Sequence, residues 1–240
     1  KAMSVYMIVQ MPGILIAQVL INFADPSSFL LFAIISVLVS VSFAPILLSV
    51  NRVPMVATAQ RMGIKGLYKA SPLGSITMIL IGGVFSLLFG MSAVYGSEKG
   101  LTVKQISLLV GSIYVAGVLC QYPVGFISDR IDRRKLIIVL SLIGFIGVAV
   151  GLIFHNNFYV ILLTFFVVGG VTNPLYSVVI AYTNDYLDHG EMSSAAGGLV
   201  FMSGAGGVVV PIFTGQLMNL FGPEFFLLVA DLIFFQNYKT

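Results

Sequence analysis

Eight long apolar stretches, separated by short polar breaks, dominate this sequence. A helix needs about 20 apolar residues to cross a lipid bilayer, and most of the stretches reach that length. They are too long for membrane-spanning β-strands and lack the strict alternation that such strands require. We therefore expect an all-α, polytopic transmembrane helix bundle with about eight spans. The stretches cover residues 2–23, 29–50, 72–95, 105–126, 136–154, 158–181, 194–220 and 225–237.

Charge is scarce throughout the chain. Charged residues make up 9% of the 240 residues and hydrophobic residues 58%, whereas soluble domains contain about 25% charged residues. A soluble chain of this size could not cover its surface with so few charges. The composition excludes most soluble enzymes, nucleic-acid-binding proteins and disordered proteins, and it makes the lipid bilayer the main solvent.

The positions of the cationic residues predict the orientation of the spans. If Lys1 faces the cytoplasm, ten of the twelve Lys and Arg residues lie on that side, and only Lys99 and Lys104 lie on the other. Cytoplasmic loops of membrane proteins carry such an excess of Lys and Arg. We therefore expect an integral protein of a bacterial inner (plasma) membrane. Its cytoplasmic segments would be residues 51–71, 128–135 and 184–193.

The first two stretches resemble the last two. The sequence QVLINF begins at Gln18 and QLMNLF begins at Gln216, 198 residues later, and FLL follows at Phe29 and Phe226 respectively. Internal repeats mark many secondary transporters, although chance similarity between apolar sequences is an alternative. A repeat of this length implies a protein of roughly 400 residues, of which this chain would be a fragment.

A polar loop between the fourth and fifth stretches carries the sharpest motif. Residues 125–135 read GFISDRIDRRK. This resembles the signature loop of the major facilitator superfamily, which has a glycine, a small residue and Asp-Arg before a basic cluster. Asp132 departs from the family pattern, which more often has glycine there, but this costs little if the turn needs no positive φ. Because the loop follows the second of six stretches from residue 72 onward, the eight spans resemble helices five to twelve of the family.

The resemblance implies a division of the chain and a role for the loop. Residues 1–50 would be the last two helices of an N-terminal bundle, 51–71 a cytoplasmic linker, and 72–240 a C-terminal six-helix bundle. The loop would be a conformational latch between adjacent helices, in which Asp129 pairs with Arg133 or faces the N-terminus of the seventh span. Alternatively, its cations only hold the loop in the cytoplasm. The latch residues would be Gly125, Asp129, Arg130, Arg133 and Arg134.

The function implied by the resemblance is secondary active transport of a small organic solute by alternating access. The expected partners are the solute, the lipid bilayer and protons as a candidate coupling ion, with no nucleic acid. Asp231 is the only acidic residue well inside a span, and its short stretch resembles the peripheral twelfth helix, so we do not expect it to couple protons. The alternative is a non-transporting membrane remnant or an interaction subunit.

Polar side chains inside the spans are candidates for the wall of a transport cavity, because polar groups that face lipid are costly. The alternative role for the same residues is an interhelical hydrogen bond. Ser86, Tyr114 and Ser203 are weaker candidates, and we expect aromatic side chains mainly to pack between helices or to anchor the membrane interfaces. The cavity candidates are Gln10, Gln121, Asn173 and Tyr176.

The sequence shows no group of side chains typical of a catalytic or metal site. Cys120 is the only cysteine, and His155 and His189 lie alone in separate turns, where we expect them to be solvated. There is no phosphate-binding glycine loop with lysine, no pair of catalytic carboxylates and no nucleophile with a neighbouring base. We therefore expect no metal, no cofactor and no enzymatic activity.

Overall fold

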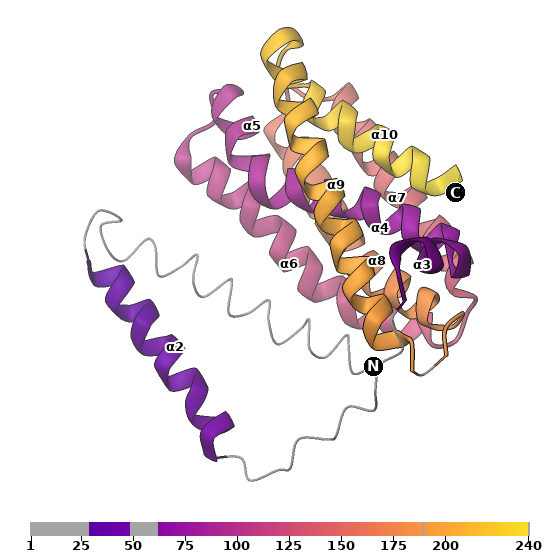
Figure 1. The fold of residues 1–240 in the computed structure, drawn as a ribbon. Coiled ribbons are helices and arrows are strands. Elements are labelled where there is room, and N and C mark those ends of the chain that lie inside the picture. Colours follow the sequence, from indigo (N-terminus) through magenta and orange to yellow (C-terminus); the bar gives the residue numbers. More distant parts are fainter. Residues whose placement is uncertain (1–28, 49–61, 189, 240) are drawn as a thin grey trace.

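The described chain is built from helices and turns. The computed structural model describes residues 29–48, 62–188 and 190–239, and within these ranges it contains no β-strand. This confirms the all-α class (Figure 1). The elements are α2 (Leu30–Leu48), α3 (Ile64–Ala70), α4 (Pro72–Ser86), the π-helical segment η1 (Leu87–Met91), α5 (Ser92–Glu98), α6 (Val103–Ser128), α7 (Arg133–Ile153), α8 (Phe158–Asn184), α9 (Met192–Phe221) and α10 (Phe225–Lys239).

Five helices of the described part are long and apolar enough to cross a membrane. They are the continuous helix Pro72–Glu98, formed by α4, η1 and α5, together with α6, α7, α8 and α9. They coincide with the five stretches predicted between residues 72 and 220. The prediction of about eight spans is not confirmed. The stretch 2–23 lies outside the described residues, and α2, with 19 residues, is not among the five candidate spans. Helix α10 has 15 residues, about 22 Å at 1.5 Å per residue.

Side chains at the helix ends explain where several helices begin. The Thr102 hydroxyl accepts the backbone N–H of Gln105, whose side chain accepts the N–H of Thr102 in return, so α6 begins with a capping box. The Asn157 side chain accepts the N–H of Tyr159 at the start of α8. Such caps satisfy backbone donors that the first helical turn leaves unpaired. Gly222, with φ of 108°, ends α9 in a conformation that favours glycine.

The helices pack pairwise around α4 and α8. Helix α8 lies between α6 and α7, α9 lies along α4, and α10 lies against α7 (Figure 1). Small residues bring the backbones together where α4 and α9 cross, because a Cβ atom at Gly206 would overlap the carbonyl oxygen of Ile79, and one at Gly82 would overlap the backbone of Ser203. Close approach through small residues is typical of helix pairs in membranes.

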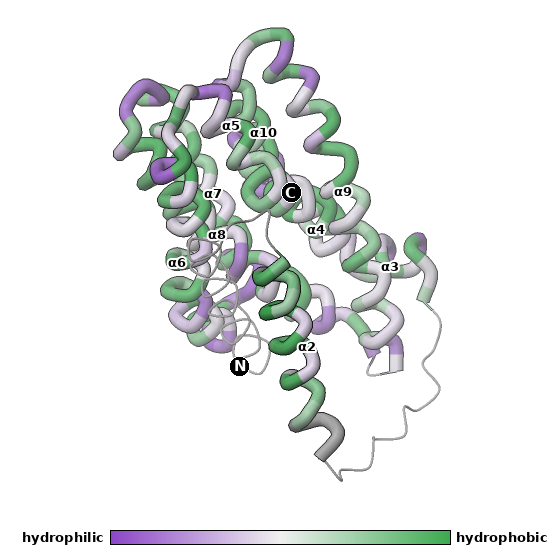
Figure 2. The backbone as a smooth tube through the Cα atoms, turned by 90° about the vertical axis from the view of Figure 1, so that its left-hand side faces the viewer, coloured by the Kyte–Doolittle hydropathy of each residue, from purple (hydrophilic) through white to green (hydrophobic). Residues whose placement is uncertain are grey.

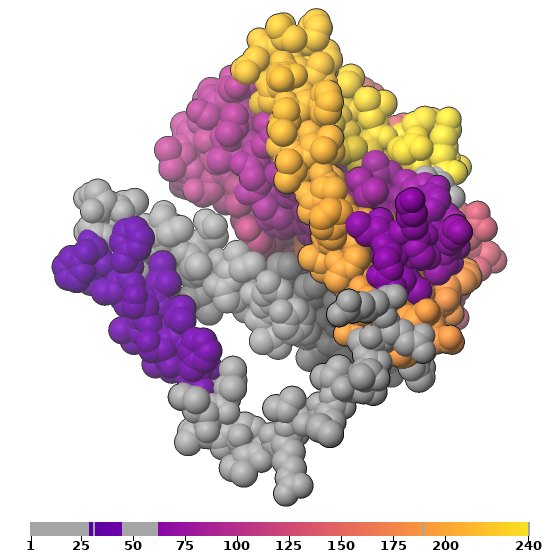
Figure 3. Space-filling view, viewed as in Figure 1, coloured from indigo at the N-terminus to yellow at the C-terminus, as the bar shows by residue number. Residues whose placement is uncertain are grey.

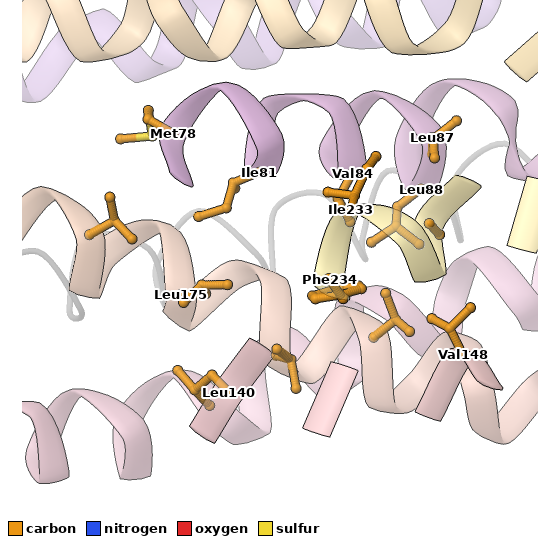
Figure 4. Close-up of a cluster of buried hydrophobic side chains, with 14 of the residues drawn as sticks. Met78, Ile81, Val84, Leu87, Leu88, Leu140, Val148, Leu175, Ile233 and Phe234 are labelled. Atoms are coloured by element: carbon orange, nitrogen blue, oxygen red, sulfur yellow. The ribbon is translucent and has the colours of Figure 1, made fainter. Parts of the chain in front are cut away.

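Apolar side chains fill the space between the helices and also cover their outer faces. Val84, Leu87 and Leu88 approach Ile233 and Phe234 of α10 inside the bundle (Figure 4). On the outside, large side chains such as Phe213, Val208 and Ile153 are more than half exposed, and Figure 2 shows hydrophobic residues along the lengths of the helices with hydrophilic ones gathered mainly toward the turns. An outer surface of this kind matches lipid as the surrounding solvent.

Helix α2 stands apart from the other helices of the described chain (Figures 1 and 3). Phe32, Val37 and Leu38, on different sides of it, are each more than half exposed. A helix that is apolar all round requires lipid or another protein surface around it. In Figure 3, α9 lies across the near face of the bundle beside the short helix α3, and the backbone N–H of Met62 donates to the Ser194 hydroxyl there at 2.9 Å.

An ionic cluster ties three turns together at one end of the bundle. The Lys99 Nζ donates to Oε1 of Glu224 at 2.7 Å, and Nε2 of His155 lies 3.9 Å from the same oxygen. His155 is therefore half-buried beside a carboxylate rather than a fully solvated loop residue. The hydrogen bond from Lys99 lowers the pKa of the Glu224 carboxyl below its ordinary value. We call this end, with its turns 99–102, 154–157 and 222–224, the Glu224 end.

The lowered pKa of Glu224 predicts a dependence of stability on pH. A carboxyl with a lowered folded-state pKa stabilises the fold fully above its unfolded-state pKa, about 4.3 for Glu, and loses this contribution as the pH falls through the folded-state value. The purified chain in detergent should therefore melt at a lower temperature as the pH falls below about 4. The Glu224→Gln variant should be less stable by about 1 kcal/mol or less at pH 7.

The pH series of the two proteins supplies the control. The difference in melting temperature between the wild type and Glu224→Gln should shrink steadily between pH 5 and pH 3. A difference that stays constant over that range would show that the Lys99–Glu224 pair contributes nothing to the stability of the fold.

The close approach of α4 and α9 predicts a sharp difference between two neighbouring glycines. Gly206→Ala should destabilise the bundle by about 1–3 kcal/mol, because its methyl group would overlap the backbone of Ile79. Gly204→Ala is the matched control, since a Cβ atom at Gly204 meets nothing within 4 Å. Thermal unfolding followed by circular dichroism in detergent measures both variants. Equal melting temperatures for the two variants would show that α4 and α9 do not approach each other this closely at Gly206.

Candidate functional site

The turn between α6 and α7 holds the predicted motif, and its backbone explains the unusual residue in it. Asp129 follows the last residue of α6, and Asp132 precedes the first residue of α7. The Asp132 carboxylate accepts the backbone N–H of Arg134 at 2.8 Å and thereby caps α7. Asp132 has φ of −57°, so the turn needs no positive φ and no glycine at this position. Its departure from the family pattern therefore supplies a helix cap.

Arg133 connects this turn to the end of α8. Its Nη1 donates to Oδ2 of Asp185 in an ion pair between the start of α7 and the residue that follows α8. The side chains of Arg133 and Asp185 are 26% and 50% exposed. A pair so accessible to water contributes about 0.2–1 kcal/mol, little enough for it to break and form again. From the sequence we expect Asp129 to pair with Arg133 or to face the N-terminus of the seventh span. The structure shows an ion pair between Arg133 and Asp185.

The other predicted latch residues surround the turn in different ways. The guanidinium of Arg130 lies over the ring of Phe126, 3.8 Å from its centroid, in a cation–π contact within its own segment. Arg134 is exposed, and Gly125 lies inside the last turn of α6. We call this region, residues 125–134 with Asp185, the Asp129 end of the bundle. The structure brings Asp129, Arg133 and Asp185 to one cavity of about 270 Å³, which Ser128, Ile131, Asp132, Tyr182 and Tyr186 also line.

Two of the predicted cavity residues are buried between α6 and α8. Nε2 of Gln121, which is 2% exposed, donates to the Ser177 hydroxyl at 2.9 Å and so joins the two helices. Asn173 is 4% exposed and donates to the carbonyl oxygen of Gly169 within its own helix. A Cβ atom at Gly117 would lie 2.8 Å from the Asn173 amide nitrogen, so α6 packs tightly against this side chain. In this conformation Gln121 joins α6 to α8 by a hydrogen bond, and Asn173 packs against Gly117 of α6. Gln10 lies outside the described residues.

Tyr176, the fourth predicted cavity residue, belongs to a row of aromatic rings that we call the aromatic row. Its ring meets Phe85 of α4 edge-on at 5.6 Å, Phe85 stacks on Phe89 of η1 at 5.5 Å, and Phe89 lies 5.1 Å from the ring of Tyr114 on α6. The sequence suggested Tyr176 and, more weakly, Tyr114, but not the two phenylalanines. Their spacing of four residues places Phe85 and Phe89 on one face of a helix, and this was the only available signal.

The backbone is irregular beside the aromatic row. The π-helical segment Leu87–Met91 interrupts the long helix, and Phe89 lies within it. The Ser92 hydroxyl donates to the carbonyl oxygen of Leu88 at 2.5 Å and so satisfies one acceptor of the wider turn. On α8, Pro174 lies two residues before Tyr176 and has no N–H to donate. Irregular backbone within the membrane occurs where it is buried in protein or lines a cavity.

No metal-binding site is evident in the described part of the chain. No group of three or more His, Cys, Asp or Glu side chains within the described ranges could hold a metal ion. The ion pairs of the described chain lie around Arg133 and around Glu224.

Comparison with known proteins identifies the family. The sequence model of the Major Facilitator Superfamily matches residues 73–235. The chain is also 26% identical over 163 residues to the MFS-type transporter YcaD of Escherichia coli (strain K12 / DH10B) and to that of Escherichia coli O157:H7 (strain EC4115 / EHEC). Each match covers 68% of this chain and 42% of the relative, so the chain spans less than half the length of these relatives. Because the family model covers more than half of the sequence and contains all five apolar helices almost entirely, the chain belongs to the Major Facilitator Superfamily.

Proposed function

We propose that this chain is part of a secondary active transporter that moves a small organic solute across the membrane by alternating access. The observation that carries the proposal is the family match over residues 73–235, which includes the five apolar helices. The relatives in Escherichia coli are named as MFS-type transporters, which supports the same class. In this mechanism two helix bundles rock around a site near the middle of the membrane.

The proposed division of the chain follows from the position of the Asp129 turn. Residues 72–240 would be the C-terminal bundle, residues 51–71 the linker, and residues 1–50 the end of the N-terminal bundle. The turn follows α6, the second helical span after residue 72, as the second copy of the family loop would. The Asp129 end would then face the cytoplasm of a bacterial cell and the Glu224 end the outside. The concentration of Arg and Lys at residues 130–135 supports this orientation.

The Asp129 end supports a proposed latch. Arg133 belongs to α7 and Asp185 follows α8, so their ion pair breaks whenever these two helix ends separate. Asp129 lies in the same cavity and can follow such a movement, while Arg130 stays against Phe126. An exposed pair worth about 1 kcal/mol or less changes the balance between two conformations without locking either. Gly125 and Arg134 complete the set of proposed latch residues.

The proposed coupling ion is the proton, and the inner helices limit where it binds. Residues 72–97, 105–128, 158–184 and 192–221 contain no Asp, Glu, Lys, Arg or His. Asp231 lies in α10, where its Oδ1 is buried without a hydrogen-bond partner among the described residues. Helix α10 packs mainly on α7, away from the aromatic row. We therefore assign Asp231 no coupling role and place the coupling group outside these helices.

Transport by the full-length gene product tests the proposal directly. Cells that carry the gene and cells from which it is deleted should differ in uptake or efflux for at least one solute in a broad panel of labelled small organic compounds. An ionophore that collapses the proton gradient should abolish the difference. The absence of any difference across the panel would favour the alternative, a non-transporting remnant or interaction subunit.

Charge reversal at the Asp129 end separates the latch from a topology anchor. Arg133→Glu and Asp185→Arg should each slow transport about two- to five-fold, the equivalent of an exposed ion pair, and the double variant should restore the rate because the pair re-forms with opposite polarity. Lys135→Glu, an exposed residue in the first turn of α7, is the matched control and should have little effect. If Lys135→Glu slowed transport as much as Arg133→Glu, and the double variant gave no rescue, the loop would act only through its net positive charge.

A further inference from the structure

The aromatic row differs from the other ring clusters of the bundle in its accessibility. Its members come from α8, α4, η1 and α6, and they are half-buried or, at Phe89, 38% exposed. By contrast, the rings of Tyr95, Phe165 and Phe226 stack at 4.9–5.9 Å and are 0–1% exposed. That sealed cluster serves packing. The residues of the row instead each remain partly exposed.

The row lies on the side of the long helix that its neighbouring helices leave less buried. Helix α4 is covered by α8, α9 and α10, and its buried residues include Met78, Ile81 and Val84 (Figure 4). Phe85 and Phe89 lie on the remaining, less buried side. The π-helical segment inserts an extra residue into the turn at Phe89 and so changes the direction of this ring relative to an ordinary helix. π-helical turns occur frequently at functional sites.

The chemistry around the row selects an uncharged ligand. The helices that carry it have no charged side chain within residues 72–97, 105–128 and 158–184. An anion would therefore meet the negative faces of the rings without a counter-charge from these helices. A cation would find no carboxylate on them to offset the loss of its water. Within the described part of the chain, neither the Tyr114 nor the Tyr176 hydroxyl makes a hydrogen bond to another protein group, and these two phenols lie at the two ends of the row. The row is thus an apolar platform with a hydroxyl at each end.

We propose that the aromatic row, Tyr176–Phe85–Phe89–Tyr114, is a binding surface for a planar, uncharged aromatic solute with polar groups at its rim. This inference rests on the proposed transport function, because it names the solute class of that site. Stacking on one ring contributes about 0.5–1.5 kcal/mol, which corresponds to about two- to twelve-fold in affinity per ring. The buried Gln121–Ser177 hydrogen bond keeps α6 and α8, and with them the two phenols, at a fixed separation.

Direct binding of tritiated 2-naphthol to the 240-residue chain in lipid nanodiscs tests the proposal. This probe is planar, aromatic and uncharged at pH 7. We expect saturable binding, measured by scintillation proximity. Decahydro-2-naphthol, with the same skeleton but no π-system, should compete at least about ten-fold more weakly, and 2-naphthalenesulfonate, the anionic counterpart, should not compete. Non-saturable binding, or equal competition by either compound, would overturn the proposal.

Ring-deletion variants locate the binding. Phe85→Leu and Phe89→Leu should each raise the dissociation constant about two- to twelve-fold, whereas Phe89→Tyr, which keeps the ring, should bind like the wild type. Phe145→Leu is the matched control, since Phe145 is half-buried and pairs with Phe235 at 5.5 Å on the other side of the bundle. Equal effects of Phe89→Leu and Phe145→Leu would place the binding elsewhere. If one variant does not fold, the competition measurements on the wild type still test the proposal.

The outcomes also separate this inference from the transport proposal. Saturable binding of 2-naphthol together with no transported solute in the panel would contradict the transporter and leave the aromatic site in place. Transport of other solutes, unaffected by 2-naphthol and without saturable binding of it, would contradict the aromatic site and leave the transporter in place.

Discussion

Backbone hydrogen bonding in the absence of water is the constraint on which this structure depends. Inside lipid, each N–H and C=O group needs a partner within the protein, and a helix supplies nearly all of them locally. The five apolar helices meet this requirement without a charged side chain across residues 72–97, 105–128 and 192–221. At η1 the Ser92 hydroxyl donates to a carbonyl oxygen of the wider turn. Prolines interrupt the hydrogen-bond pattern inside α6, α8 and α9, at Pro123, Pro174 and Pro211. The aromatic row lies at η1 and near Pro174.

Charge is confined to the ends of the bundle, and it acts differently at each. At the Glu224 end, Lys99 and His155 converge on one carboxylate and hold three turns together. At the Asp129 end, a single exposed pair, Arg133 with Asp185, bridges two helix ends. The first arrangement suits a closed, stable end, because several groups share the contact. The second is the weaker contact, because it is a single exposed pair between the ends of two helices that also pack on each other.

The sequence predicted the helices well and their partners poorly. Long apolar runs and turn residues give the positions of α6 to α9 to within a few residues, because hydrophobicity and helix caps act locally. The turn at Asp129 was predicted from its motif. Asp132 has a negative φ, so the condition under which it costs little in place of glycine is met. The count of about eight spans is not confirmed, since the stretch of residues 2–23 lies outside the described chain and α10 has only 15 residues. Pairings such as Gln121 with Ser177, and the row that joins Phe85 to Tyr176, depend on which helices pack together, and no local pattern encodes that.

Cysteine accessibility tests the central claim, that charge-free helices cross the membrane and leave their polar ends on opposite sides. In a Cys120→Ser background, single cysteines replace Lys135 at the Asp129 end and Asn156 at the Glu224 end, both of which are exposed. In intact bacterial cells, a membrane-impermeant maleimide should label Asn156→Cys at once and Lys135→Cys only after the membrane is permeabilised. Labelling of both positions from the same side would contradict the account.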